Sequence, residues 1–158
     1  MLLSSGAHAG FVYREDRQGP IHSAIVHKQP ELVHLLVNRK DVDPNALSSG
    51  RTPLEIAVDV NEEYLVEILL TDKRVNPDLT GRSRSRTPLL KAALKSNEAM
   101  IRLLLAAGAN KEIQDATFLS PVMLLGAPSA EARRQLIQGR SLLDSDPDIM
   151  LALDTTSD

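Results

Sequence analysis

A sequence period of about 33 residues constrains the fold of this chain more than any other feature. Four segments open with a proline followed by an apolar residue. Their prolines stand at positions 20, 53, 88 and 121, so the spacings are 33, 35 and 33 residues. A repeat of this length is the signature of a solenoid, in which each unit buries its apolar face against the next one.

Each opening predicts the start of a helix. Thr52, Thr87 and Ser120 stand directly before a proline, where their hydroxyls can accept a backbone N–H. Proline itself fits the first helical position, because its missing N–H has no partner there in any case. Gly19 takes the place of the hydroxyl residue in the first unit, so we expect a weaker cap.

A second apolar block follows the opening in each of the first three units. These blocks span residues 32–37, 65–70 and 100–105, and each contains one polar residue at the same place. The pattern predicts a mostly buried helix with one solvent-facing edge. Each unit is therefore expected to consist of a helix, a turn, a second helix and an extended loop.

These units resemble the ankyrin repeat. The match rests on Thr-Pro-Leu at 52–54 and 87–89 and on Leu-Leu-Ala-Ala-Gly-Ala-Asn at 104–110. It covers roughly residues 19–138 and implies an all-α ankyrin-repeat solenoid with a hairpin loop, here called a finger, between repeats. Only His22 keeps the histidine that follows Thr-Pro-Leu in the family. The sequence therefore does not decide whether the row of polar contacts made by these histidines, here called the polar ladder, forms in the other repeats.

The resemblance divides the chain into three parts. Residues 2–7 resemble residues 104–109, so the N-terminal segment is predicted to be the remnant of a preceding repeat, either cut from a longer array or reduced to a cap. Arg133 and Arg134 replace apolar residues of the previous repeat, which predicts a C-terminal cap with a polar outer face. The expected parts are a remnant at 1–18, a repeat domain at 19–140 (repeats near 19–47, 48–81, 82–114 and 115–140) and an acidic and apolar tail at 141–158 with a short helix.

Composition limits the chemistry of the chain. It contains no cysteine, which excludes disulfides and thiol nucleophiles and is typical of a cytoplasmic or nuclear protein. Its four histidines lack the spacing of a helical metal site, and no catalytic or phosphate-binding motif is found. We therefore expect a protein that is not an enzyme and binds neither metal nor cofactor. No apolar run is long enough to span a membrane. A net charge of −3 and only 3% aromatic residues argue against nucleic acid as a partner.

Charge is distributed unevenly. Residues 112–158 hold eight acidic and three basic residues, whereas residues 73–86 hold five basic residues and one acidic. If the segment 82–86 is extended, its alternating arginines project from one face, and Arg51 holds the matching place one repeat earlier. Arginine binds carboxylate or phosphate through two parallel hydrogen bonds. The pattern predicts a basic cluster on the finger tips that binds an acidic or phosphorylated partner segment, with a solvated loop as the alternative.

The resemblance also implies a groove, because partners of ankyrin proteins usually touch the finger tips and the exposed face of the first helix. Ile56, Val60 and Leu94 are apolar at places expected to face solvent, so they are candidate anchors, with packing against neighbouring repeats as the alternative. The predicted partner-binding residues are Arg51, Ile56, Asp59, Val60, Arg82, Arg84, Arg86, Lys91, Leu94 and Lys95.

The expected function is recognition of another protein, in which rigid stacked helices present a pre-ordered concave face. Three alternatives stay open: a targeting or substrate-recruiting arm of a larger enzyme or assembly, a binder of an anionic ligand, and a structural spacer. We expect a monomeric domain of a longer chain. The tail is predicted either to dock over the open end of the array or to bind another protein as a short motif.

Overall fold

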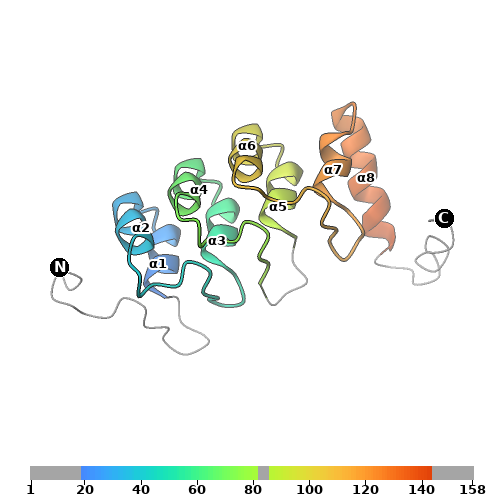
Figure 1. Ribbon diagram of the computed structural model, residues 1–158. Coiled ribbons are helices and arrows are strands. Elements are labelled where there is room, and N and C mark those ends of the chain that lie inside the picture. The colour runs from blue at the N-terminus through green and yellow to red at the C-terminus, as the bar shows by residue number, and fades with distance from the viewer. Residues whose placement is uncertain (1–18, 82–85, 144–158) are drawn as a thin grey trace.

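The computed structural model describes residues 19–81 and 86–143, and in these residues it contains helices and no strand (Figure 1). The first two repeats contain α1 (Pro20–Val26), α2 (Pro30–Val37), α3 (Pro53–Asp59) and α4 (Glu63–Leu70). The last two contain α5 (Pro88–Leu94), α6 (Glu98–Ala106), α7 (Pro121–Leu125) and α8 (Ala130–Leu143).

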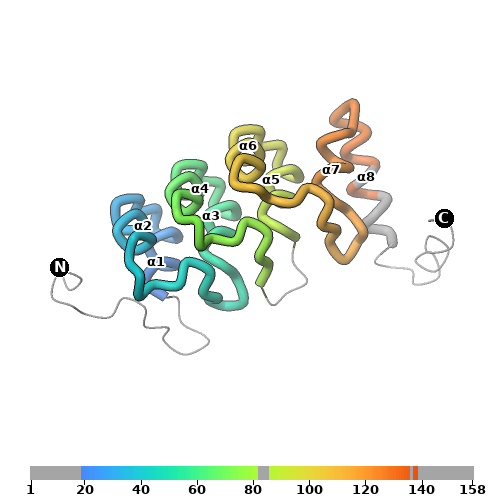
Figure 2. Tube along the Cα trace, in the orientation of Figure 1, coloured from blue at the N-terminus to red at the C-terminus, as the bar shows by residue number. Residues whose placement is uncertain are grey.

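The helices stack in two rows. The first helices of the repeats, α1, α3, α5 and α7, contact one another in chain order and form the inner row. The second helices α2, α4 and α6 stack in the same way and form the outer row. Successive repeats therefore lie side by side, with the first and the fourth repeat at opposite ends of the array (Figure 2). The predicted all-α solenoid is confirmed.

Small residues allow the inner helices to approach closely. Ala24, Ala57 and Ala92 occupy the same position in three repeats, and their exposed fractions are 1%, 0% and 0%. Long apolar side chains of the outer helices, such as Leu36 and Leu69, are fully buried against them. One continuous apolar core consequently runs through the stacked repeats.

Two of the three predicted hydroxyl caps form. The Thr52 hydroxyl accepts a hydrogen bond from the amide of Glu55 at 3.1 Å, and the Thr87 hydroxyl accepts one from the amide of Leu90 at 3.2 Å. Ser120 makes no such bond. The amide of Val122 donates instead to the carbonyl of Lys111 at 2.8 Å, so the preceding finger satisfies the start of α7.

The fingers between repeats touch one another through their backbones. At the tip of the finger of residues 38–52, Ser48 and Arg51 exchange two hydrogen bonds of 2.9 and 3.0 Å across a turn with positive φ at Ser49 and Gly50. A side chain on Gly81 of the next finger would place its Cβ 1.5 Å from the carbonyl oxygen of Gly50. Only glycine fits there.

The fourth repeat departs from the expected cap. Arg133 turns back toward the third repeat, where its Nη1 donates to the Ser96 hydroxyl at 3.3 Å, so it does not form a polar outer face. Val122 and Leu125 on α7 are 37% and 38% exposed, whereas their counterparts in the earlier repeats are buried. The N-terminal remnant at 1–18 and the predicted short helix in the tail lie outside the described residues.

Candidate protein-binding surface

One apolar side chain per repeat lies at the C-terminal end of an inner helix. Val26 ends α1, Val60 follows α3 and Leu94 ends α5. Val26 is 38% exposed, while Val60 and Leu94 are half-buried and pack partly against the core. These three residues, here called the groove row, therefore offer apolar surface to solvent in three successive repeats. Charged or polar neighbours adjoin them, namely His27, Asp59 and Lys95.

The third predicted anchor, Ile56, does not face solvent. Its exposed fraction is 3%, because α3 turns this position into the core between neighbouring repeats. The prediction of solvent exposure was therefore wrong for Ile56. Packing against neighbouring repeats, the alternative that the sequence left open, is what the structure contains at this position.

Lys91 connects the second and third repeats. Its Nζ lies 3.2 Å from the Asp59 carboxylate on α3 and 3.9 Å from Oε1 of Glu55. The Lys91 side chain is 16% exposed and that of Glu55 is 0% exposed. The ammonium therefore lies between an exposed carboxylate and a buried one, and the pair ties α5 to α3.

Lys95 caps the C-terminal end of α3. Its Nζ donates to the carbonyl oxygens of Val58 at 2.8 Å and Asp59 at 3.0 Å. These carbonyls stand at the C-terminal end of α3, where a positive charge is favourable because of the helix dipole. Lys95 thus has a structural role in addition to its place beside the groove row.

The polar ladder between fingers persists with changed chemistry. His22 donates from Nε2 to the carbonyl of Ala46 at 2.7 Å. In the next repeat, the Glu55 carboxylate accepts from the amides of Thr52 at 2.8 Å and Gly81 at 3.1 Å. The side chain at this position donates a hydrogen bond in the first repeat (His22) and accepts one in the second (Glu55). The finger correspondingly contributes the carbonyl of Ala46 in the first case and the amide of Gly81 in the second.

The buried environment of His22 affects its charge. Burial lowers its pKa below the ordinary value of 6.5, and the hydrogen bond to Ala46 opposes that shift only in part. The neutral ring is therefore favoured in the folded protein.

The predicted arginine cluster is partly paired within the chain. The Nη1 of Arg51 lies 3.4 Å from the Asp59 carboxylate, and the Nε of Arg86 donates to Asp115 at 3.1 Å. The remaining members, Arg82 and Arg84, lie outside the described residues. Arg51 and Arg86 each have a carboxylate partner, so an incoming acidic group has to compete with it.

The Asp115 carboxylate stabilises the finger that precedes α7 through several hydrogen bonds. Its carboxylate, 3% exposed, accepts from the Thr117 hydroxyl at 2.6 Å and from the amides of Thr117 and Leu119 at 2.8 and 3.1 Å. Burial raises the pKa of Asp115, but these hydrogen bonds and that from Arg86 outweigh it, so the pKa lies below its ordinary value of 3.8.

The same finger presents an aromatic side chain that the sequence reasoning missed. Phe118 is 40% exposed and has a φ of +58°, a conformation that a bulky residue rarely adopts. Its position matches Gly50, one of the two positive-φ residues of an earlier finger. The Asp-x-Thr spacing at 115–117, typical of a side-chain-stabilised turn, was the signal that could have revealed it.

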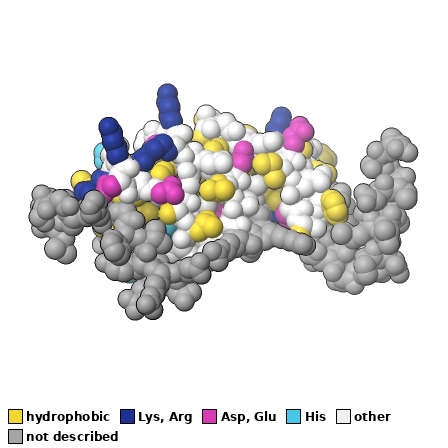
Figure 3. Space-filling view, turned by 60° about the horizontal axis from the view of Figure 1, so that its bottom comes forward, with side chains coloured by type: hydrophobic (Ala, Val, Ile, Leu, Met, Phe, Trp, Pro, Cys, Tyr) yellow, Lys and Arg dark blue, Asp and Glu magenta, His cyan; other side chains and the backbone are white. Residues whose placement is uncertain are grey.

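A second basic region lies apart from the finger tips. Lys73 and Arg74 belong to the basic run at 73–86, yet they lie in the loop after α4, where they border a shallow hollow with Lys40. Arg74 donates to the carbonyls of Val37 at 3.0 Å and Val42 at 3.1 Å. Arg74 therefore caps the C-terminal end of α2. Figure 3, which brings the finger side forward, shows most of its visible basic side chains toward the N-terminal part of the array.

Asp72 holds Arg74 in that position. Its carboxylate accepts hydrogen bonds from the Arg74 Nη2 at 2.7 Å and from the Arg74 amide at 2.9 Å. The hydrogen bond from the Arg74 side chain is the main reason why the pKa of Asp72 lies below 3.8.

The surface offers recognition chemistry. Within residues 19–81 and 86–143, no group of three or more histidine, aspartate or glutamate side chains is arranged to hold a metal ion. In the same part of the chain, no helix is long and apolar enough to cross a membrane. What the described inner helices and fingers supply is apolar surface beside paired charges.

Comparison with known proteins gives a consistent result. A family model described as "Ankyrin repeats (3 copies)" matches residues 1–81 and 21–115. The chain is 28% identical to "Protein glp-1" of Caenorhabditis elegans over 99% of its own length, which is 13% of that protein. It is 32% identical to "Putative ankyrin repeat protein FPV014" of Fowlpox virus (strain NVSL), covering 69% of this chain and 24% of that protein.

A solved structure agrees with this match. The ankyrin repeat domain of Bcl-3, described as a unique member of the IkappaB protein family, superposes with a TM-score of 0.66 and 29% sequence identity. The match covers 85% of this chain and 59% of the Bcl-3 chain.

Proposed function

Because the chain belongs to the ankyrin repeat family, whose repeats are generally protein–protein interaction modules, we propose that it binds a partner protein along the groove row. The observation that carries this proposal is that Val26 and Leu94 end two inner helices and Val60 directly follows the inner helix between them. Because the helices are already ordered, little conformational entropy is lost when a partner binds.

The fingers extend the proposed site. Phe118 and Leu47 are 40% and 39% exposed on two fingers, and aromatic side chains are frequent anchors in protein interfaces. The groove row would supply the apolar centre of the interface, with Asp59, Lys91 and Lys95 at its polar rim. Rim charges mainly affect the rate of encounter and partner selection.

We also propose that the finger arginines favour a partner with an acidic or phosphorylated segment. Arg86 can exchange its bond to Asp115, because that carboxylate keeps its bonds to Thr117 and Leu119. Arg51 has the same opportunity beside Asp59. Arg82 and Arg84 complete the proposed basic rim, as the sequence predicts.

The experiment is an affinity capture with matched variants. Val26→Asp combined with Val60→Asp places two charges in the groove row, and Leu35→Asp combined with Leu105→Asp does the same on the outer helices. Leu35 and Leu105 are 44% and 38% exposed, so the control changes surface of similar exposure. All baits must show the same helical melting curve.

A partner captured by the native and control chains but lost from the groove variant supports the proposal. A partner lost only from the outer-helix variant would contradict it. Reversing Arg82, Arg84 and Arg86 to glutamate in the same experiment tests the acidic segment separately. That part fails if partner affinity at low salt changes less than twofold.

The wider role is also a proposal. Ankyrin repeats are typically non-catalytic, and we propose the same for this chain, with the cytoplasm or nucleus as its location. The chain spans 13% and 24% of the two curated relatives named above. A targeting or recruiting arm of a larger assembly is therefore the second candidate. An anionic small ligand would leave the apolar groove row uncovered, which argues against such a ligand as the main target.

A further inference from the structure

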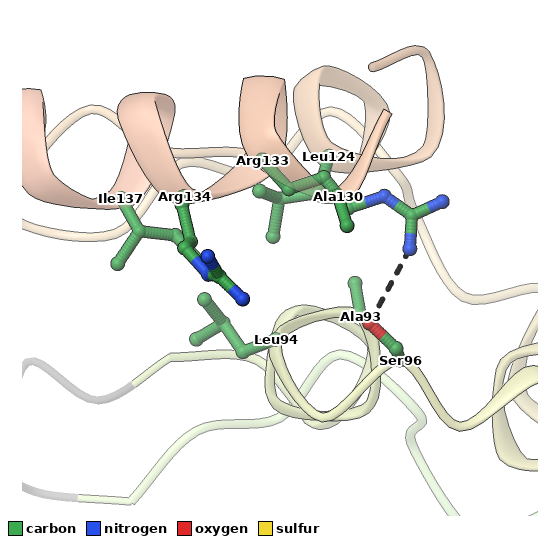
Figure 4. A pocket seen from close by; sticks show the side chains of 8 residues that line it. All are labelled: Ala93, Leu94, Ser96, Leu124, Ala130, Arg133, Arg134 and Ile137. Carbon is green, nitrogen blue, oxygen red and sulfur yellow. Dashed lines mark hydrogen bonds between the residues drawn. The ribbon is translucent and has the colours of Figure 1, made fainter. Parts of the chain in front are cut away.

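A pocket of about 230 Å³ lies between the third and fourth repeats (Figure 4). Leu94 of α5 and Ile137 of α8 face each other across it, and Ala93, Leu124 and Ala130 complete its apolar walls. The other lining residues are Ser96, Arg133 and Arg134, whose polar groups are an hydroxyl and two guanidiniums. The pocket is therefore apolar with a positively charged edge.

Arg133 is poorly satisfied where it lies. Its Nη1 donates to Ser96 at 3.3 Å, but its Nε is buried without a hydrogen-bond partner. Counted from the residues that cap the two helices, Asn97 and Ser129, its position corresponds to Ile101 of the previous repeat, a residue with 9% exposure. A guanidinium has thus replaced an apolar side chain, and no carboxylate in the described part of the chain forms an ion pair with it.

Arg134 can exchange its ion-pair partner, Glu131, for another carboxylate. Its Nη1 lies 3.4 Å from Glu131, and the two side chains are 71% and 66% exposed. Exposed pairs of this kind contribute about 0–1 kcal/mol to stability. A second carboxylate can therefore replace Glu131 at small cost.

The ligand that fits such a pocket is acidic and apolar together. A partly buried guanidinium without a counter-charge is unfavourable, and a carboxylate is its strongest hydrogen-bonding partner. Aliphatic groups beside that carboxylate would cover Leu94 and Ile137. A purely acidic or purely apolar ligand satisfies only half of the pocket.

The chain itself supplies such a segment. Residues 144–158, which lie outside the described residues, contain five aspartates and no lysine or arginine, together with Ile149, Met150, Leu151 and Leu153. Segment and pocket are complementary in both charge and polarity. Another acidic and apolar stretch without lysine or arginine, residues 52–72, is already folded into α3 and α4.

The segment is also long enough to return to the pocket. α8 ends at Leu143, and the rise of an α-helix places that residue about 15 Å beyond Arg133. Five extended residues, 144–148, span about 17 Å. The apolar run that begins at Ile149 can therefore reach back to the pocket.

We propose that residues 144–158 dock within the same molecule into the pocket between α5 and α8. Aspartates of the segment pair with Arg133 and Arg134, and its apolar run covers Leu94 and Ile137. The tether raises the effective concentration of the segment to the millimolar range, so a weak contact is sufficient. This places the segment between repeats three and four, and not over the exposed Val122 and Leu125 at the open end.

Paramagnetic relaxation in the full-length chain tests the proposal. The chain has no cysteine, so Thr155→Cys provides a single attachment site for a nitroxide beside the apolar run. The expected result is loss of more than half of the amide signal intensity for residues 94–97 and 130–137 at low salt. Signals of α1 and α2 should keep their intensity.

Charge variants test the contribution of the two arginines. Arg133→Glu with Arg134→Glu should restore the signals near the pocket, whereas Lys40→Glu with Lys73→Glu, an equal charge change at the far end, should not. If the glutamate pair lowers the helical melting temperature, Arg133→Gln with Arg134→Gln and a titration to 1 M salt replace it. Broadening that survives these changes overturns the proposal.

Two further outcomes would also overturn it. One is broadening centred on Val122 and Leu125, which would place the segment over the open end. The other is broadening in a mixture of isotope-labelled chain without nitroxide and unlabelled chain with nitroxide, since that signal requires contact between molecules. Uniform signals throughout the array would equally exclude docking.

Discussion

The ion pair between Lys91 and Glu55 makes the sharpest energetic prediction. Removing one partner of a buried pair costs about 3–5 kcal/mol, because the remaining charge is left in an apolar environment. Here the 3.9 Å separation is long, and the Glu55 carboxylate keeps two backbone N–H donors. We therefore expect Lys91→Met to lower the free energy of unfolding by about 2 kcal/mol.

A double-mutant cycle separates this pair from the rest of the Lys91 side chain. Glu55→Gln removes the charge but keeps an oxygen that can accept from Thr52 and Gly81. In that background Lys91→Met leaves no buried charge behind, so its cost should fall by about 1 kcal/mol or more. Asp59→Asn, which removes the exposed partner of Lys91, should cost only about 0.5 kcal/mol.

Urea unfolding followed by helical circular dichroism is the assay, since the chain has no tryptophan. The slope of each transition must stay constant, because a changed slope would mean that repeats unfold separately. If the two substitutions are additive within about 0.3 kcal/mol, Lys91 does not stabilise the buried carboxylate and the reasoning is refuted.

Four further substitutions test the folding account. Thr87→Val should cost about 1 kcal/mol because it removes a helix cap, while Ser120→Ala, at a cap without a side-chain bond, should cost less than about 0.5 kcal/mol; equal urea midpoints would contradict this. Gly81→Ala should displace the finger from Gly50 and lower the melting temperature, and an unchanged amide spectrum around Gly50 would show that the fingers are not in contact. Because the pKa of His22 is lowered by burial, the unfolded chain binds a proton first as pH falls below 6.5, so stability decreases from there down to the folded pKa; His22→Gln should flatten this dependence between pH 7.5 and 5.5.

The period and the caps explain how much of the fold could be predicted from the sequence. Thr-Pro-Leu specifies the start of a helix locally, and recurrence every 33 to 35 residues requires the units to stack. The polar residues at the solvent-facing edge of the outer helices, His34, Glu67 and Arg102, are all exposed, as their pattern predicted. These features depend on neighbours in sequence, so one sequence is sufficient to find them.

The candidate surface was harder to predict because it depends on contacts between repeats. The burial of Ile56 follows from how α3 is turned against its neighbours, which the period does not specify. Arg51 and Arg86 were predicted to belong to a basic cluster, and their pairing with Asp59 and Asp115 depends on contacts that the sequence does not specify. Arg133 was expected to face outward, but its side chain turns toward Ser96 of the third repeat.

Site-specific photo-crosslinking tests the central claim, that the groove row binds a partner, most directly. A photoreactive phenylalanine analogue replaces either Val60, in the groove row, or Tyr64, which is 61% exposed on the outer helix α4. Both chains are irradiated under the same conditions in an extract that contains the partner. The account predicts a covalent adduct with one protein from position 60 and none from position 64. An adduct with that protein from position 64 alone would contradict it.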